Sequence, residues 1–130
     1  MDIKPIAYVR SDFTGKFGIP RQSGVVPELV AYVVFEPEYR SAEALLGLEE
    51  YDYIWLIWEF SANRQEGWSP TVRPPRLGGN VRKGVFATRS PYRPNALGLS
   101  SVRLDGIVET PEGLVLRVLG ADLMDGTPVY

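Results

Sequence analysis

The 130-residue chain contains neither cysteine nor histidine. Without cysteine it can form no disulfide, no thiolate zinc site and no cysteine nucleophile. Without histidine it lacks the commonest metal ligand and the usual general base, so catalytic triads that depend on histidine are excluded. The phosphate-binding patterns GxGxxG and GxxxxGK[ST] are absent as well. Rossmann and P-loop nucleotide binding therefore have no support in this sequence.

Long apolar runs are also missing. The longest, Tyr53–Trp58, is far shorter than the roughly 20 residues that a transmembrane helix needs. The N-terminal residues do not show a basic segment followed by an apolar one, so no secretion signal is predicted. With 45% hydrophobic and 23% charged residues, the composition is typical of a globular protein. We expect one domain over residues 1–130, cytoplasmic and without membrane association.

Charge is distributed unevenly along the chain. Residues Arg64 to Arg93 include seven basic side chains and one acid, whereas the remainder holds seven basic and fifteen acidic side chains. A basic stretch on an acidic protein can be a binding surface for nucleic acid or another anion. It can equally be the solvated face of a long loop. Charge alone leaves both interpretations open.

Hydrophobic patterning favours a mainly β fold. Short runs rich in valine and aromatic residues predict strands at Ile3–Val9, Leu29–Phe35, Tyr53–Phe60, Val81–Thr88, Leu99–Glu109 and Leu114–Leu119. We expect the third of these to be buried on both faces, since aromatics and aliphatics fill both sets of alternating positions. Many short strands with frequent glycine and proline predict a small single-domain β-barrel.

Three local features accompany the predicted strands. Ser41 is a suitable N-cap for the one short helix, Ala42–Leu48. Residues Thr110–Gly113 form a hairpin turn between the last two strands, and Gly106 marks a β-bulge. Two long loops, Ser11–Pro27 and Ser61–Asn80, interrupt the pattern. Loops of this length in a compact domain are usually functional or mobile.

The segment Gly84–Ser101 reads GVFATRSPYRPNALGLSS and carries the strongest signal for a binding site. Its two prolines exclude regular helix and a central strand around Ser90–Asn95. Arg89 and Arg93 can each offer a planar fork of donors to a carboxylate or phosphate. A stiff polar loop between apolar segments therefore predicts a site for an anionic ligand.

Other polar and aromatic positions are ambiguous when read from residue chemistry alone. The Pro20–Gln22 segment could hold donors for a polar ligand, although an ordinary surface turn is the favoured interpretation. Asp125-Gly126 is a turn signal. Asp122, just after an apolar run, could end a strand and face a ribose or an ammonium group, or it could shape the turn. Near the end of the third predicted strand lie Trp55, Trp58 and Phe60. These aromatic side chains could stack on a purine, but positions in the hydrophobic core are favoured for them.

The sequence VFATRSPYRPNALGLS at Val85–Ser100 closely resembles the signature of the TsaA-like, or TrmO, family of S-adenosylmethionine-dependent tRNA adenosine N6-methyltransferases. Three further motifs resemble the same family in order: IPRQSG at Ile19–Gly24, LEEYDYIWLIWEF at Leu48–Phe60 and ADLMDGTPV at Ala121–Val129. The resemblance covers nearly the whole chain.

This resemblance implies a small β-barrel that binds S-adenosylmethionine and forms a homodimer with the cofactor near the subunit interface. It also implies methyl transfer to N6 of threonylcarbamoyladenosine beside the anticodon of tRNA. One alternative is a non-catalytic S-adenosylmethionine-binding module, or a methyltransferase with a different substrate. A further alternative is a protein that binds RNA without using the cofactor.

The family's site residues can be assigned to the positions of this sequence that match the family's motifs. The resemblance implies that the cofactor is contacted by Pro20, Arg21, Gln22, Ser61, Ala62, Arg89, Leu99, Gly120, Ala121, Asp122 and Leu123. Arg89 would hold the carboxylate of the methionine moiety, and Asp122 or backbone carbonyls would meet its ammonium group. Arg93 and Asn95 belong to the signature and are expected either to hold the loop or to bind the RNA substrate. No residue is assigned a catalytic role, and no metal is predicted.

The sequence departs from the family pattern in two places. Members commonly have histidine directly after the phenylalanine that ends the aromatic strand, whereas Phe60 is followed here by Ser61. Longer members continue beyond the DGTPV motif, whereas this sequence ends at Tyr130. Substrate recognition that depends on such an extension would have to be weaker or supplied otherwise.

Overall fold

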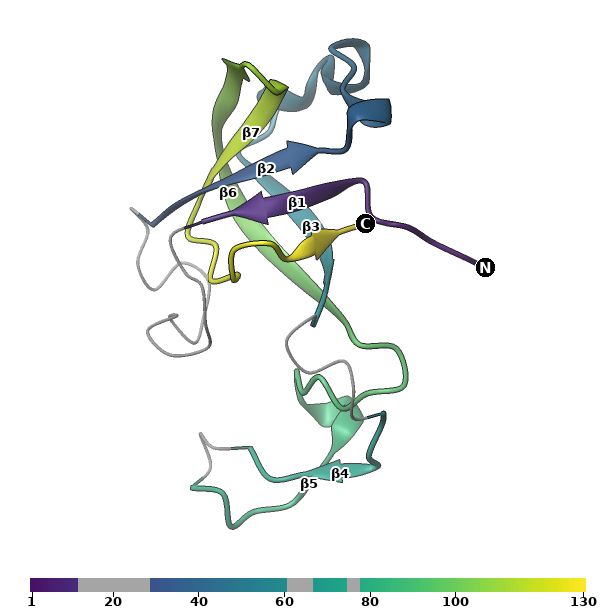
Figure 1. The fold of residues 1–130 in the computed structure, drawn as a ribbon. Coiled ribbons are helices and arrows are strands. Elements are labelled where there is room, and N and C mark those ends of the chain that lie inside the picture. The colour runs from purple at the N-terminus through teal and green to yellow at the C-terminus, as the bar shows by residue number, and fades with distance from the viewer. Residues whose placement is uncertain (12–28, 61–66, 75–77) are drawn as a thin grey trace. The chain divides into compact units, whose positions relative to one another are not determined.

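A computed structural model describes residues 1–11, 29–60, 67–74 and 78–130 of the chain. These residues divide into two compact units (Figure 1). The sheet unit comprises Met1–Trp58 together with Leu99–Tyr130, and the loop unit comprises Glu59–Gly98.

Six strands make up the main sheet. They are β1 (Ala7–Arg10), β2 (Val30–Phe35), β3 (Tyr53–Glu59), β6 (Leu97–Thr110), β7 (Gly113–Leu119) and β8 (Pro128–Val129). Their spatial order is β1-β2-β7-β6-β3-β8, and β8 also pairs with β1, so the order closes on itself. The strand pairs β1–β2, β1–β8, β2–β7, β3–β8 and β6–β7 are antiparallel. The prediction of a mainly β fold is confirmed.

Alternating side chains of these strands form the hydrophobic core. Among the described residues, the largest fully buried side chains are valines, including Val33, Val102 and Val118. Beside them, the indole Nε1 of Trp58 donates a hydrogen bond of 3.0 Å to the hydroxyl of Ser100. Both residues are buried, so this bond satisfies the polar end of a large aromatic side chain inside the core.

Strand β3 differs from its prediction. Leu56 and Trp58 are buried, but Tyr53, Trp55 and Ile57 are 58%, 69% and 48% exposed. The strand therefore has one face toward the core and one toward solvent, and the expectation of burial on both faces is wrong. Period-two alternation separates the two faces, and aromatic residues on both of them concealed that separation in the sequence.

The β6–β7 hairpin forms as predicted. Its strands end at Thr110 and begin again at Gly113, and these two residues pair across the turn. The Thr110 hydroxyl donates to the carbonyl of Gly113 and accepts from the backbone N–H of Glu112. The register shifts between Leu104 and Gly106, which confirms the predicted bulge.

The predicted helix at Ala42–Leu48 is helical only in short pieces. Two 3-10 turns, η2 (Glu43–Leu45) and η3 (Leu48–Glu50), follow another turn, η1 (Pro37–Tyr39). Gly47 separates η2 from η3 in a left-handed conformation with φ of +84°, which ends helical propagation. The residue that caps η2 is Ala42 rather than Ser41, and it makes no side-chain cap bond. No helix within the described ranges is long and apolar enough to span a membrane.

The loop unit contains a small two-stranded sheet of β4 (Thr71–Val72) and β5 (Lys83–Gly84). A 3-10 turn, η6 (Val85–Ala87), follows β5 directly. The strand predicted over Val81–Thr88 is therefore wrong for most of its length. The cause is local, because the N–H and the hydroxyl of Thr88 both donate to the carbonyl of Val85 and close a turn there.

Candidate functional site

The loop that follows η6 is held by a chain of short hydrogen bonds. The Thr88 hydroxyl donates to Val85 at 2.8 Å and accepts from the Ser90 N–H at 3.2 Å. The Ser90 hydroxyl in turn accepts from the Tyr92 N–H at 3.2 Å, and the Tyr92 carbonyl accepts from the Ser69 N–H at 2.7 Å. Side-chain bonds of this kind fix a loop whose prolines prevent regular secondary structure.

Arg93 contributes to the architecture of this loop. Its Nη1 donates to the carbonyl of Thr88 at 3.1 Å, and the side chain is half-buried. This bond ties the Arg93 guanidinium to the backbone of the loop. That Arg93 serves the loop rather than the RNA substrate stays a prediction. Arg89 and Asn95 are exposed. The Asn95 carbonyl accepts from the Leu97 N–H at 2.7 Å where the chain enters β6.

We expect the variant Thr88→Val to loosen the loop without unfolding the chain. It removes one hydroxyl that makes two hydrogen bonds, each contributing about 0.5–1.5 kcal/mol. Amide hydrogen exchange at Ser90 should therefore accelerate roughly 5- to 150-fold, whereas Thr88→Ser should keep the wild-type rate. Equal exchange rates in Thr88→Val and the wild type would contradict this description of the loop.

The sheet unit contains the second group of predicted site residues, at the end of β7. Gly120 adopts a left-handed conformation with φ of +78°, which favours glycine, and its N–H donates to the Leu29 carbonyl at 2.9 Å. Ala121 and Leu123 are 1% and 3% exposed. Asp122 lies between these two buried residues in the sequence and is itself half-buried. Burial of its two neighbours therefore fixes the backbone on both sides of the Asp122 carboxylate.

Ser11 ties the end of β1 to this segment. Its hydroxyl donates to the Leu123 carbonyl at 3.0 Å, and its N–H donates to Asp125 Oδ1 at 2.9 Å. Asp125 and Gly126 form a turn, and the Gly126 N–H donates to the Val9 carbonyl. The structural interpretation of Asp125-Gly126 is thus confirmed. The anchoring role of Ser11 had no signal in the sequence, because its partners lie more than a hundred positions away.

The predicted residues fall into three groups. Arg89, Arg93 and Asn95 belong to the loop unit, whereas Leu99, which is 54% exposed, and Gly120–Leu123 belong to the sheet unit. Five others lie outside the described residues: Pro20, Arg21, Gln22, Ser61 and Ala62. That these groups serve one ligand stays a prediction.

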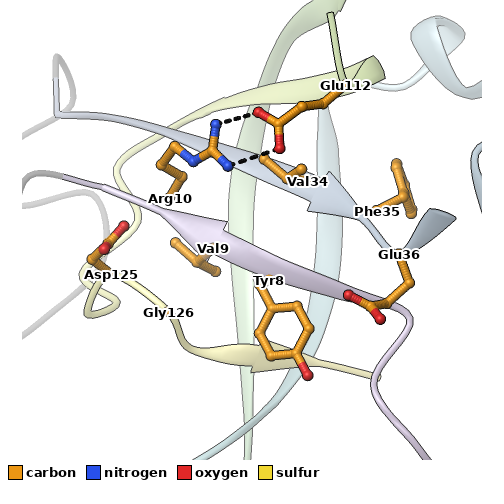
Figure 2. A pocket seen from close by; sticks show the side chains of 9 residues that line it. All are labelled: Tyr8, Val9, Arg10, Val34, Phe35, Glu36, Glu112, Asp125 and Gly126. Atoms are coloured by element: carbon orange, nitrogen blue, oxygen red, sulfur yellow. Dashed lines mark hydrogen bonds and ion pairs between the residues drawn. The ribbon is translucent and has the colours of Figure 1, made fainter.

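A separate hollow of about 290 Å³ lies over β1 and β2 in the sheet unit (Figure 2). Arg10 faces Glu112 there and makes two parallel hydrogen bonds of 2.6 and 3.0 Å to its carboxylate. Glu36 and Asp125 also line the hollow, whereas the predicted site residues that the structure describes are not among its lining residues.

The Arg10–Glu112 pair gives a pH-dependent contribution to stability. Its hydrogen bonds hold the pKa of the Glu112 carboxyl below the ordinary value of 4.5. Because the pKa is lower in the folded state, the contribution is present above pH 4.5 and is lost as the pH falls through the folded value. Both side chains are substantially exposed, so the effect is small and weakens with salt.

We expect Glu112→Gln to remove this pH dependence. The melting temperature of the wild type should fall more steeply than that of the variant as the pH drops below 4.5. Thermal unfolding of both proteins across that range measures the difference. Parallel curves in low salt would show that the pair contributes no stability.

Comparison with known proteins identifies the class to which these features belong. The family model for the tRNA-methyltransferase O N-terminal domain matches residues 8–130. The chain is 44% identical over 124 residues to the tRNA (adenine(37)-N6)-methyltransferase of Escherichia coli, covering 95% of this chain and 53% of that protein. It is 45% identical over 127 residues to a Pseudomonas aeruginosa protein named as a candidate S-adenosylmethionine-dependent methyltransferase, covering 98% of this chain and 53% of that protein.

A solved structure agrees with these relatives. The crystal structure of TrmO from Pseudomonas aeruginosa has a TM-score of 0.75 and 40% identity, covering 99% of this chain and 52% of that one. The chain belongs to the tRNA-methyltransferase O N-terminal domain family. It spans about half the length of the curated relatives named above. The family predicted from the four sequence motifs is confirmed.

Proposed function

We propose that the chain acts in S-adenosylmethionine-dependent methylation of tRNA, at N6 of threonylcarbamoyladenosine beside the anticodon. The observation that carries this proposal is the 44% identity, over 95% of the chain, to a protein named for methylation of adenine 37 in tRNA. The second curated relative supports the choice of cofactor, because its name includes dependence on S-adenosylmethionine.

The chemistry of the predicted residues supports a site for the methionine part of this cofactor. That part carries one carboxylate and one ammonium group. Among the described residues, the predicted cofactor set contains a guanidinium, Arg89, and a carboxylate, Asp122. Arg89 lies on a loop fixed by hydrogen bonds, and Asp122 lies between two buried anchors. Fixed positions matter because oriented charged groups lose little freedom when a ligand binds. We propose cofactor contacts from Leu99, Gly120–Leu123 and Arg89, together with Pro20, Arg21, Gln22, Ser61 and Ala62.

The absence of histidine and cysteine is compatible with this chemistry. S-adenosylmethionine, when bound, supplies an electrophilic methyl group on a sulfonium centre. What the chain must contribute is orientation, so that the cofactor and the adenine nitrogen are held in line. The hydrogen-bonded loop over Thr88–Asn95 provides the rigidity that such orientation needs. We propose that Arg93 maintains this loop.

We further propose that residues 1–130 belong to one domain with a β-barrel and that the protein is a cytoplasmic homodimer. One family model spans residues 8–130 and thus both units, which supports a single domain. The closed strand order supports a barrel. The exposed row of Tyr53, Trp55 and Ile57 on β3 offers an apolar surface for a second copy. Sedimentation equilibrium of the chain tests the dimer.

Methyl transfer is the test of the function. The chain is incubated with radiolabelled S-adenosylmethionine and with two tRNA samples, one carrying the threonylcarbamoyl group and one lacking it. We expect label only in the modified sample, at the adenosine beside the anticodon. Cofactor binding without transfer to either sample would instead identify a non-catalytic binding module. Transfer to both samples would identify a different substrate.

A further inference from the structure

The loop unit has the opposite charge to the rest of the chain. Glu59–Gly98 contains seven basic and two acidic residues, a net charge of +5, whereas the remaining residues hold seven basic and fourteen acidic ones, a net charge of −7. Arg82 and Lys83, at the start of β5, are both exposed. A positive surface of this kind on an acidic protein attracts polyanions selectively to one part of the molecule.

Two large aromatic side chains are exposed in the same unit. Phe86 is 72% exposed and Trp68 is 56% exposed. The β4–β5 register pairs Thr71 with Gly84, and the bond of 2.9 Å from the Val85 N–H to the Pro70 carbonyl continues that register by one step. Phe86 follows one end of this bond by one residue, and Trp68 precedes the other end by two residues. The two aromatic residues belong to the same end of the small sheet.

The backbone beside each aromatic residue is anchored. Val85, next to Phe86, is 1% exposed, and its carbonyl accepts both bonds from Thr88. Ser69, next to Trp68, donates its N–H to Tyr92 and its hydroxyl to Thr71 at 2.8 Å. Phe86 and Trp68 are thus presented to solvent by fixed backbone rather than by a free chain end.

We propose that Trp68 and Phe86, with Arg82 and Lys83, form a docking surface for unpaired RNA bases. Bases stack on the aromatic rings, and the basic side chains meet the neighbouring phosphates. Positive charge together with exposed aromatic rings favours a single-stranded nucleic acid, which carries both phosphates and unstacked bases. This inference rests on the proposed function, because it assigns the unpaired loop of the tRNA substrate to a specific surface of the loop unit.

Fluorescence anisotropy with two labelled probes tests the proposal without cofactor. One probe is an RNA hairpin with an unpaired adenosine-containing loop, and the other is a fully paired RNA duplex of the same length. Loss of stacking should weaken hairpin binding roughly 5- to 100-fold in Phe86→Ala and in Trp68→Ala, with little change for the duplex. Tyr51→Ala removes an aromatic side chain that is 65% exposed in the sheet unit and should leave hairpin binding unchanged.

The salt dependence separates stacking from charge. Arg82→Ala and Lys83→Ala should each reduce the slope of log affinity against log salt by about 0.7, whereas Phe86→Ala should leave the slope unchanged. Phe86→Trp keeps a stacking surface and should retain hairpin affinity.

Equal losses for hairpin and duplex, or wild-type affinity in both aromatic variants, would overturn the assignment. The same conclusion follows if the wild-type chain binds neither probe or binds acidic peptides in preference. Failure of the proposed function would give a different result in these experiments. In that case the hairpin still distinguishes Phe86→Ala from the wild type, but no methyl group reaches any tRNA.

Discussion

Replacing Arg89 by alanine is expected to weaken S-adenosylmethionine binding by about 1.5–3 kcal/mol, or roughly 10- to 150-fold. The variant removes the cation proposed to meet the carboxylate of the methionine moiety, and hydrogen bonds to charged groups contribute in this range. The hydrogen bonds of Thr88, Ser90 and Arg93 remain in the variant and should hold the loop in its conformation. Isothermal titration calorimetry measures the change.

Two matched variants make this result specific. Arg73→Ala removes another exposed cation of the loop unit and should leave cofactor affinity unchanged. Arg89→Lys keeps the charge but loses the planar fork of donors, so its affinity should lie between those of the wild type and Arg89→Ala. Wild-type affinity in Arg89→Ala would remove Arg89 from the cofactor site.

Replacing Trp58 by alanine should lower the free energy of unfolding by about 3–5 kcal/mol. The indole is 8% exposed, so its removal leaves a large cavity and also a buried Ser100 hydroxyl without its donor. Trp68→Ala deletes the same side chain from a position that is 56% exposed, and should change stability by less than about 0.5 kcal/mol. Denaturant unfolding of both variants gives the comparison.

Similar losses in the two tryptophan variants would contradict the assignment of Trp58 to the core and Trp68 to the surface. The Trp68→Ala measurement has a second use. If that variant is as stable as the wild type, any loss of RNA affinity that it shows comes from the missing ring rather than from unfolding.

Local patterns predicted the features of the fold that depend on local physics. The Thr110–Gly113 turn, the bulge at Gly106 and the Asp125-Gly126 turn all follow from backbone preferences of neighbouring residues. The helical segment was predicted in the right place but at too great a length, because the left-handed Gly47 interrupts it. Features that depend on residues far apart in the sequence could not be predicted from local patterns. The pairing of β8 with β1 and β3 involves only two residues, too few to give a periodic pattern.

In the candidate site, too, some features could be predicted from local sequence and others could not. Proline and arginine spacing indicated a stiff polar loop, and its hydrogen bonds confirm that description. The exposure of Phe86 had no signal in the sequence. A strand over Val81–Thr88 would give alternate residues opposite faces, whereas the 3-10 turn buries Val85 and exposes Phe86 and Ala87. The bonds from Thr88 to the Val85 carbonyl close this turn, and they depend on the folded loop.

The central claim is that the segments carried over from the family motifs hold S-adenosylmethionine in this chain. Amide hydrogen exchange, followed by mass spectrometry with and without the cofactor, tests it most directly. Saturating cofactor should slow exchange at Gly120–Leu123 and at Thr88–Ser90, because bound ligand suppresses local opening. It should also slow exchange at Arg21 and Gln22. Unchanged exchange in all of these segments, with S-adenosylmethionine bound, would contradict the claim.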